Sequence, residues 1–148
     1  MKKICLIPGI IAIFFLSCEK SSYDELEISM GSVCGWCAGS DSLHITSEKT
    51  HYNYTKLCTA DFSIDEQTSR KDWDELVDIL DIREFEKINL NSCFSCVDGC
   101  DTWICINHNS GSHQIRYAYY DSLEISSIRP FIDKLEAIRT SIRSEMPE

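Results

Sequence analysis

Cysteines are the residues of this sequence best suited to chemistry, since the 148-residue chain contains nine of them. Two pairs have Cys-x-x-Cys spacing: Cys34 with Cys37, and Cys93 with Cys96. A pair with this spacing forms a disulfide, exchanges disulfides with other thiols, or binds zinc as thiolates. Which of these applies depends on the compartment in which the chain works and on the elements that carry the cysteines.

The first residues of the chain predict that compartment. Met1-Lys2-Lys3 is basic, and residues 4–16 carry no charge. A basic start followed by an apolar stretch of this length is typical of a secretory signal peptide, whereas a membrane-spanning helix needs about 20 apolar residues. We therefore predict a signal peptide at residues 1–17, a tether at residues 18–24 and a single domain at residues 25–145.

The stretch Phe15-Leu16-Ser17-Cys18 resembles the lipobox of bacterial lipoproteins. It departs from the commonest lipobox at Phe15, where leucine is usual, and at Leu16, where a small residue is usual. The resemblance implies that Cys18 becomes the N-terminus and carries a diacylglyceryl group and a fatty acid such as palmitate. It also implies a location in the cell envelope of a Gram-negative-type bacterium, anchored to a membrane at its periplasmic face or at the cell surface. Plain secretion and an uncleaved anchor are the alternatives.

Export favours disulfides, because thiols outside the cytoplasm tend to oxidise and small exported domains gain stability from crosslinks. Cys5 would leave with the signal peptide and Cys18 would carry lipid. Seven candidate disulfide cysteines then remain, namely Cys34, Cys37, Cys58, Cys93, Cys96, Cys100 and Cys105. Full pairing leaves one thiol free, and each choice of that thiol allows 15 pairings of the others. A bridge between Cys58 and Cys105, on two predicted strands, is one of these arrangements.

Two other uses of the Cys-x-x-Cys pairs stay open. A thiol-disulfide oxidoreductase using Cys34 and Cys37 would need a helix after the first cysteine, but residues 38–42 have the composition of a turn. A structural zinc site would take four thiolates, from Cys34, Cys37, Cys93 and Cys96. The gap of 59 positions between Cys37 and Cys96 exceeds the spacing of common zinc ribbons.

Residues 93–106 resemble a motif of uncharacterised bacterial lipoproteins, in which Cys-x-x-Cys precedes Ala-Asp-Gly-Gly, an acidic residue, tryptophan and a strand. The matching residues are Cys93, Cys96, Asp98, Gly99, Trp103, Ile104 and Ile106. Cys100 replaces the second glycine and Cys105 is additional. The resemblance implies a fold and a location but no activity. We expect a tight turn at Asp98-Gly99, with Gly99 at positive φ and the cysteines pinning the turn to a sheet edge.

Other catalytic patterns are missing from the sequence. His44, His51, His108 and His113 lack metal-ligand spacing, and no nucleophile elbow, phosphate-binding glycine loop or His-Glu-x-x-His sequence occurs. Structural or solvated roles are therefore expected for these histidines. The tyrosines at 117, 119 and 120 form either a binding patch on the sheet or part of its core.

The elements that carry these residues follow from the apolar pattern. Alternation predicts strands near residues 25–30, 43–46 and 51–58, and a hairpin of residues 103–107 and 114–120. Helical spacing of Trp73, Leu76, Val77 and Leu80 predicts one helix, and a second helix begins near residue 127. We therefore predict an α+β two-layer sandwich, with an antiparallel sheet of about five strands covered by two helices in the order β-β-β-α-β-β-α.

Charge narrows the class of partner. The formal net charge is −10, and −12 once Lys2 and Lys3 leave with the signal peptide. An acidic surface repels nucleic acid and anionic lipid, so we expect neither as a ligand. We predict a non-enzymatic binding or structural module of the cell envelope, with no cofactor, that contacts the membrane through its lipid and binds an envelope protein or peptide. Whether the chain is an enzyme stays open.

Overall fold

The computed structural model describes residues 25–35, 39–55 and 61–145. The predictions for the signal peptide, the lipidated Cys18 and the tether concern residues outside these ranges. The same holds for Cys37 and Cys58, so the pairing proposed for Cys58 with Cys105 is not described.

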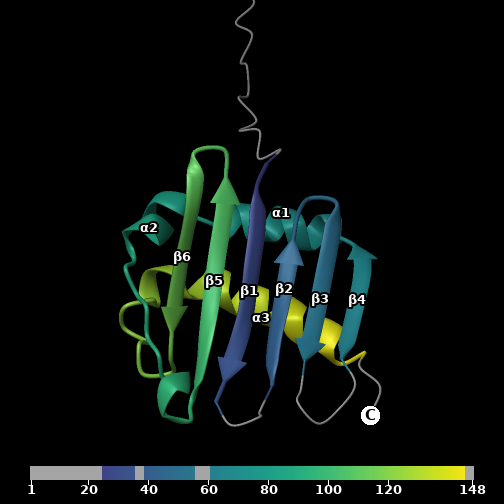
Figure 1. Cartoon of the computed structure of the whole chain (residues 1–148). Coiled ribbons are helices and arrows are strands. Elements are labelled where there is room, and N and C mark those ends of the chain that lie inside the picture. Colours follow the sequence, from purple (N-terminus) through teal and green to yellow (C-terminus); the bar gives the residue numbers. More distant parts are fainter. Residues whose placement is uncertain (1–24, 36–38, 56–60, 146–148) are drawn as a thin grey trace, which may run out of the picture.

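Six antiparallel strands form one sheet in the order β4-β3-β2-β1-β5-β6 (Figure 1). Their bounds are β1 Glu27–Cys34, β2 Ser40–Ile45, β3 Lys49–Thr55, β4 Phe62–Gln67, β5 Cys100–His108 and β6 Gly111–Tyr117. The first strand lies inside the sheet, between β2 and β5. This position brings the residues around Cys34 beside those around Cys100.

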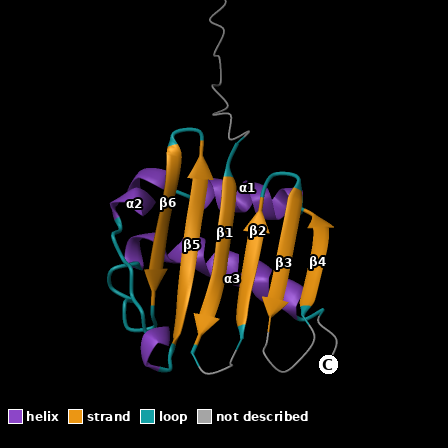
Figure 2. Ribbon diagram, viewed as in Figure 1, coloured by secondary structure: helices purple, strands orange, loops and turns teal. Residues whose placement is uncertain are grey.

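The described helices lie against one face of the sheet and leave the other face open (Figure 2). They are α1 Arg70–Ile79, α2 Ile82–Lys87 and α3 Arg129–Arg143, with 3₁₀ turns η1 Ser95–Val97 and η2 Ser126–Ile128. The α+β class, with an antiparallel sheet covered by helices, is therefore confirmed. The two helices predicted around Trp73 and after residue 127 are both present.

The core lies between the sheet and the helices. Ile28 and Met30 on β1 are fully buried, and Met30 is paired with Leu43 on one side and Ile104 on the other. Trp73, Leu76, Phe131 and Leu135 bury the facing sides of α1 and α3. Ser69 caps α1 by accepting a hydrogen bond from the Asp72 amide.

The predicted count and order of elements were wrong in two places. Residues 62–67 form β4, so the sheet has six strands rather than five, and α2 is an additional helix. The observed order is β-β-β-β-α-α-β-β-α. Strand β4 was missed because it is an edge strand with polar residues in every second position and only half-buried Phe62 and Ile64 between them. Helix α2 has six residues and one buried side chain, Phe85, too few for a helical period.

Candidate functional site: the cysteine loop and its aromatic patch

Two disulfides are present, and they join four of the predicted cysteines. Cys34 bonds to Cys100, which is its direct partner across β1 and β5, and Cys93 bonds to Cys96. The structure therefore contains disulfides, at four of the seven candidate cysteines. Cys105 has no disulfide partner within the described ranges, and its Sγ lies 3.4 Å from the Ser112 hydroxyl.

The pairing bears on both alternatives raised for the Cys-x-x-Cys motifs. Cys34 is joined to Cys100 rather than to Cys37, which lies outside the described residues. Cys93 and Cys96 are joined to each other. Among the residues that the structure describes, no group of three or more histidine, cysteine, aspartate or glutamate side chains is arranged to hold a metal ion.

Residues 91–99, which we term the cysteine loop, lie beside the outer edge of β6. The amide of Ser92 donates to the Arg116 carbonyl, and the amide of Arg116 donates to the Leu90 carbonyl, both at 2.9 Å. Asn91 thereby forms a parallel bridge with Arg116. The loop then turns through η1 and enters β5 at Cys100.

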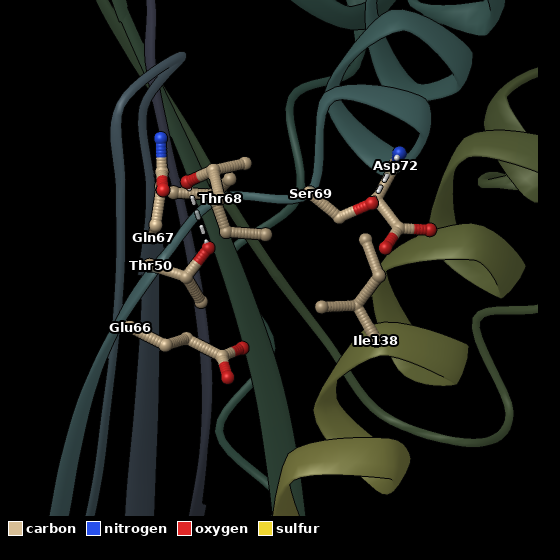
Figure 3. Close-up of a pocket in the computed structure, with 8 residues that line it drawn as sticks. Thr50, Glu66, Gln67, Thr68, Ser69, Asp72 and Ile138 are labelled. Atoms are coloured by element: carbon tan, nitrogen blue, oxygen red, sulfur yellow. Dashed lines mark hydrogen bonds between the residues drawn. The ribbon is translucent and has the colours of Figure 1, made fainter.

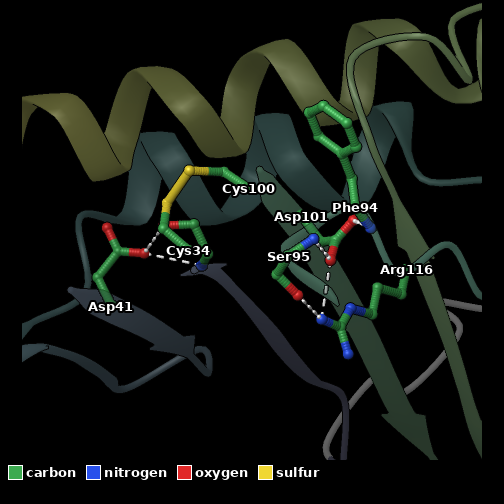
Figure 4. Close-up of a disulfide and its surroundings, with 8 residues drawn as sticks. Cys34, Asp41, Phe94, Ser95, Cys100, Asp101 and Arg116 are labelled. Atoms are coloured by element: carbon green, nitrogen blue, oxygen red, sulfur yellow. Dashed lines mark hydrogen bonds and ion pairs between the residues drawn. A yellow bond between two sulfur atoms is a disulfide. The ribbon is translucent and has the colours of Figure 1, made fainter. Parts of the chain in front are cut away.

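A buried carboxylate holds the loop in place. Asp101 is 1% exposed and accepts hydrogen bonds from the amides of Phe94 at 2.8 Å and Ser95 at 2.9 Å (Figure 4). Arg116, from β6, donates to the same carboxylate at 2.8 Å and to the Ser95 hydroxyl at 2.6 Å. The Asp101 side chain thus links the cysteine loop, β5 and β6 through hydrogen bonds, in addition to the Cys93–Cys96 disulfide.

The charge of Asp101 is favoured by these partners. Burial by itself raises the pKa of the carboxyl group, but the hydrogen bonds from Ser95 and Phe94 and from the Arg116 guanidinium outweigh it. The net effect is a pKa below the usual range for aspartate. Asp101 is therefore a carboxylate at neutral pH.

The Asp98-Gly99 turn was predicted with the wrong residue at positive φ. Asp98 adopts the left-handed conformation at φ 68°, and Gly99 does not. Gly99 is instead required for space, because a Cβ atom there would overlap the ring of Phe94. The ring of Phe94 therefore lies directly on the loop backbone.

Phe94 belongs to a cluster of three aromatic rings, which we term the aromatic patch. Its ring centroid lies 5.6 Å from that of Tyr119 and 5.5 Å from that of Tyr120, and the two tyrosines are 5.4 Å apart. All three contacts have edge-to-face geometry. Tyr119 is 79% exposed and Tyr120 is 52% exposed. Exposed Val97 and Leu123 lie in the same two segments.

The two segments that supply the patch are linked by Asp121. Its carboxylate accepts hydrogen bonds from the Ser92 hydroxyl at 2.6 Å and from the Ala118 amide at 2.7 Å. The tyrosines were predicted on one strand, but β6 ends at Tyr117, which is buried in the core. Tyr119 and Tyr120 lie in the turn beyond it, so the binding interpretation applies to these two alone.

The histidines each have a local partner. His51 contacts Asp65 at 2.7 Å, His44 contacts the Ser29 hydroxyl at 2.8 Å, and His108 contacts Glu86 at 3.0 Å. His113 contacts the Ile88 carbonyl at 2.8 Å. These contacts support the structural roles expected from the sequence.

A partly enclosed pocket lies elsewhere among the described residues, where β4 leads into α1, with Ile138 of α3 on its other side (Figure 3). Its volume is about 130 Å³, and Thr50, Glu66 and Asp72 are among its lining residues. A pocket for an organic ligand usually measures about 300 to 1,000 Å³. This one has room for a few water molecules, so it is a weaker candidate than the aromatic patch.

No protein-family model matches the sequence, and no curated protein matches it.

None of the described helices is long and apolar enough to cross a membrane.

Sequence analysis identified the cysteines of the site but missed Asp101, Phe94 and Arg116. The only signal for Asp101 was its place after Cys100, as the acidic residue of the lipoprotein-like motif. Phe94 was one of the two unspecified residues between Cys93 and Cys96. Arg116 is on β6, far from both in sequence, and nothing local connects it to them.

Proposed function

We propose that the chain is an exported, lipid-anchored binding module without catalytic activity, and that its aromatic patch binds a segment of another envelope protein. The observation that carries this proposal is that the exposed rings of Tyr119 and Tyr120 pack against Phe94, which lies on the loop braced by the Cys93–Cys96 disulfide and Asp101, while Asp121 links the two segments.

Exposure and rigidity together favour a binding role. Clustered apolar side chains on a surface mark interaction sites more often than isolated ones do. Tyrosine and phenylalanine lose little conformational entropy on binding, and the edge-to-face contacts among the three rings reduce that loss further. Leu123 is 83% exposed and Val97 67% exposed, and these apolar side chains lie in the two segments that supply the patch.

Charge indicates the chemistry of the partner. Asp98 lies in the cysteine loop and Glu124 follows Leu123, and both side chains are exposed. The chain as a whole carries a formal charge of −10. A peptide segment with apolar side chains and neighbouring lysine or arginine would therefore fit the patch.

Panning of a displayed random-peptide library against the purified chain tests the binding role. We expect enrichment of peptides that combine an aromatic or aliphatic anchor with lysine or arginine. A Tyr119→Ser/Leu123→Ser variant should bind the enriched peptides at least about tenfold more weakly, since each anchor of an interface contributes more than about 1 kcal/mol. Binding is measured by titration calorimetry.

Ile79→Ser is the matched control, because Ile79 is 42% exposed on α1 and lies outside the patch. It should bind as the unchanged chain does. If no peptides are enriched, or if the patch variant binds them as well as the control, the proposed role is wrong.

The lipid anchor is tested separately, in the producing cells. Mass spectrometry of the membrane fraction should find a chain that begins at Cys18 with a diacylglyceryl thioether and a fatty acid. A Cys18→Ser variant should lose both the lipid and the membrane association. A chain that keeps residues 1–17, or one that carries no fatty acid, would contradict the anchor.

A further inference from the structure

We infer that the Cys93–Cys96 disulfide is a thiol-exchange site, which reacts with a thiol of a protein bound at the aromatic patch. The inference goes beyond binding, because it assigns a covalent reaction to the cysteine loop. Cys34–Cys100 is a structural bond by comparison. Three observations separate the two disulfides.

The first observation is access. Both cysteines of the loop disulfide are exposed residues, whereas in the other pair Cys100 is exposed and Cys34 is half-buried. Exchange requires a thiolate to approach a disulfide sulfur, so exposure governs which bond reacts. Phe94, between the two cysteines, belongs to the aromatic patch, so a partner held there lies next to the bond.

The second observation is that the loop has a fixed position without its disulfide. The amides of Phe94 and Ser95 remain bonded to Asp101, and Ser92 remains bonded to Arg116 and Asp121. Opening the Cys93–Cys96 bond therefore leaves the loop and the patch in place. Exchange needs no unfolding.

The third observation concerns the other bond. Cys34 and Cys100 are directly paired residues of β1 and β5, 66 positions apart in the chain. This bond closes a loop of 66 positions between two central strands, so breaking it by exchange would destabilise the fold, whereas breaking Cys93–Cys96 opens a loop of only 3 positions.

The reaction balances without a further reagent. A partner thiolate attacks one sulfur of the Cys93–Cys96 bond, that bond breaks, and the other cysteine leaves as a thiolate that takes a proton from water. The product is a mixed disulfide between the partner and the loop. If the partner has a second thiol, its attack on the mixed disulfide oxidises the partner by two electrons and leaves Cys93 and Cys96 reduced.

The test uses reduced glutathione as the probe, with the purified chain. The reaction is stopped with acid at intervals, free thiols are alkylated, and peptides are analysed by mass spectrometry. We expect Cys93 and Cys96 to become labelled at least tenfold faster than Cys34 and Cys100, with an unchanged circular dichroism spectrum. Equal rates, or labelling that appears only as the spectrum is lost, would overturn the inference.

A second arm separates the exchange from the binding role. An aromatic, lysine-containing peptide with one cysteine should react with the loop faster than glutathione does. The Tyr119→Ser/Leu123→Ser variant should lose this advantage but keep the glutathione rate. If the peptide has no advantage while glutathione still prefers Cys93 and Cys96, the exchange site stands and the binding role fails. If glutathione shows no such preference, the exchange site fails whatever the peptide does.

Discussion

The two disulfides of this domain differ in what they connect. Cys34–Cys100 closes a loop of 66 positions and joins two central strands, whereas Cys93–Cys96 spans 3 positions within one turn. On the chain-entropy model, a bond that closes the longer loop stabilises the fold by about 4 kcal/mol and one that closes the shorter loop by about 1.5 kcal/mol. The first bond therefore serves the fold, and the second serves the local shape of a surface.

A buried aspartate accompanies each disulfide, and the two lie on opposite faces of the sheet. Asp41 accepts hydrogen bonds from the Ser32 amide and hydroxyl and from Tyr52, and it forms an ion pair with Arg139 of α3. Asp101 binds loop amides and Arg116 instead. The first carboxylate joins the sheet to a helix, and the second joins the sheet to the cysteine loop.

The largest expected effect comes from the disulfides themselves. A Cys34→Ser/Cys100→Ser variant should lose about 4 kcal/mol of unfolding free energy, and Cys93→Ser/Cys96→Ser about 1.5 kcal/mol or less. Urea denaturation followed by circular dichroism measures both. Equal losses in the two variants would remove the distinction between the bonds.

The second-largest loss of stability is expected when Asp41 is replaced. Asp41→Ala leaves Arg139 without its buried partner, and Arg139 has a side chain that is only 12% exposed. Loss of one member of a buried ion pair costs about 3 kcal/mol or more. Tyr52→Phe removes a single hydrogen bond to the same carboxylate and should cost about 1 kcal/mol. If Asp41→Ala and Tyr52→Phe unfold at the same urea concentration, the buried ion pair stabilises the fold no more than the single hydrogen bond does, and this prediction is wrong.

Asp101→Asn should cost less, about 2 kcal/mol, because Arg116 is partly exposed and water can solvate it. Its effect should be local. Hydrogen exchange should speed up at the Phe94 and Ser95 amides while the β2 and β3 amides stay protected. Uniform loss of protection over the sheet would mean that Asp101 serves the whole fold, as Asp41 does.

The same variant has a defined pH dependence. The pKa of Asp101 is lowered in the folded state. The stabilisation that its carboxylate gives the fold is therefore complete above the unfolded pKa of about 3.9, and it is lost as the pH falls through the folded pKa. The stability difference between the unchanged chain and Asp101→Asn should therefore be constant from pH 7 to about 5 and shrink below about 4. A difference that grows in acid would contradict this assignment.

The smallest effect is expected at Glu66, beside the small pocket. Burial raises the pKa of its carboxyl group, and the charges of Glu145 and Asp72 add to that rise. A raised pKa means that the ionised form destabilises the fold above the folded pKa. Glu66→Gln should thus stabilise the domain at pH 7 by about 0.5 kcal/mol or less, since Glu66 is exposed, and have no effect below about pH 4.

Local patterns predicted the elements whose apolar faces are complete. The spacing of Trp73 and Leu76 sufficed for α1, and alternation at Ile28 and Met30 sufficed for β1. Local patterns did not predict β4, because this edge strand buries few apolar side chains. The strand order was beyond reach as well, since it depends on pairings between β1 and β5 that are separated by most of the chain.

The candidate site was predicted in its covalent part only. Cys-x-x-Cys spacing indicated chemistry at Cys93 and Cys96, but spacing does not select Cys100 as the partner of Cys34. The contacts that place Phe94 at the surface involve Asp101 and Tyr119, 7 and 25 positions away. Such contacts exist only after folding, so no local signal could reveal them.

The bridge between Asn91 and Arg116 has a consequence for association between copies of this chain. The outer edge of β6 would otherwise offer free amides and carbonyls to the strands of another molecule. At Arg116 both of these groups are already bonded, to Leu90 and Ser92. At the opposite edge, β4 carries Asp65 and Glu66, whose charges repel an identical neighbour. Lateral strand pairing, a step toward aggregation in sheet proteins, is thus opposed at Arg116 on one edge and at Asp65 and Glu66 on the other.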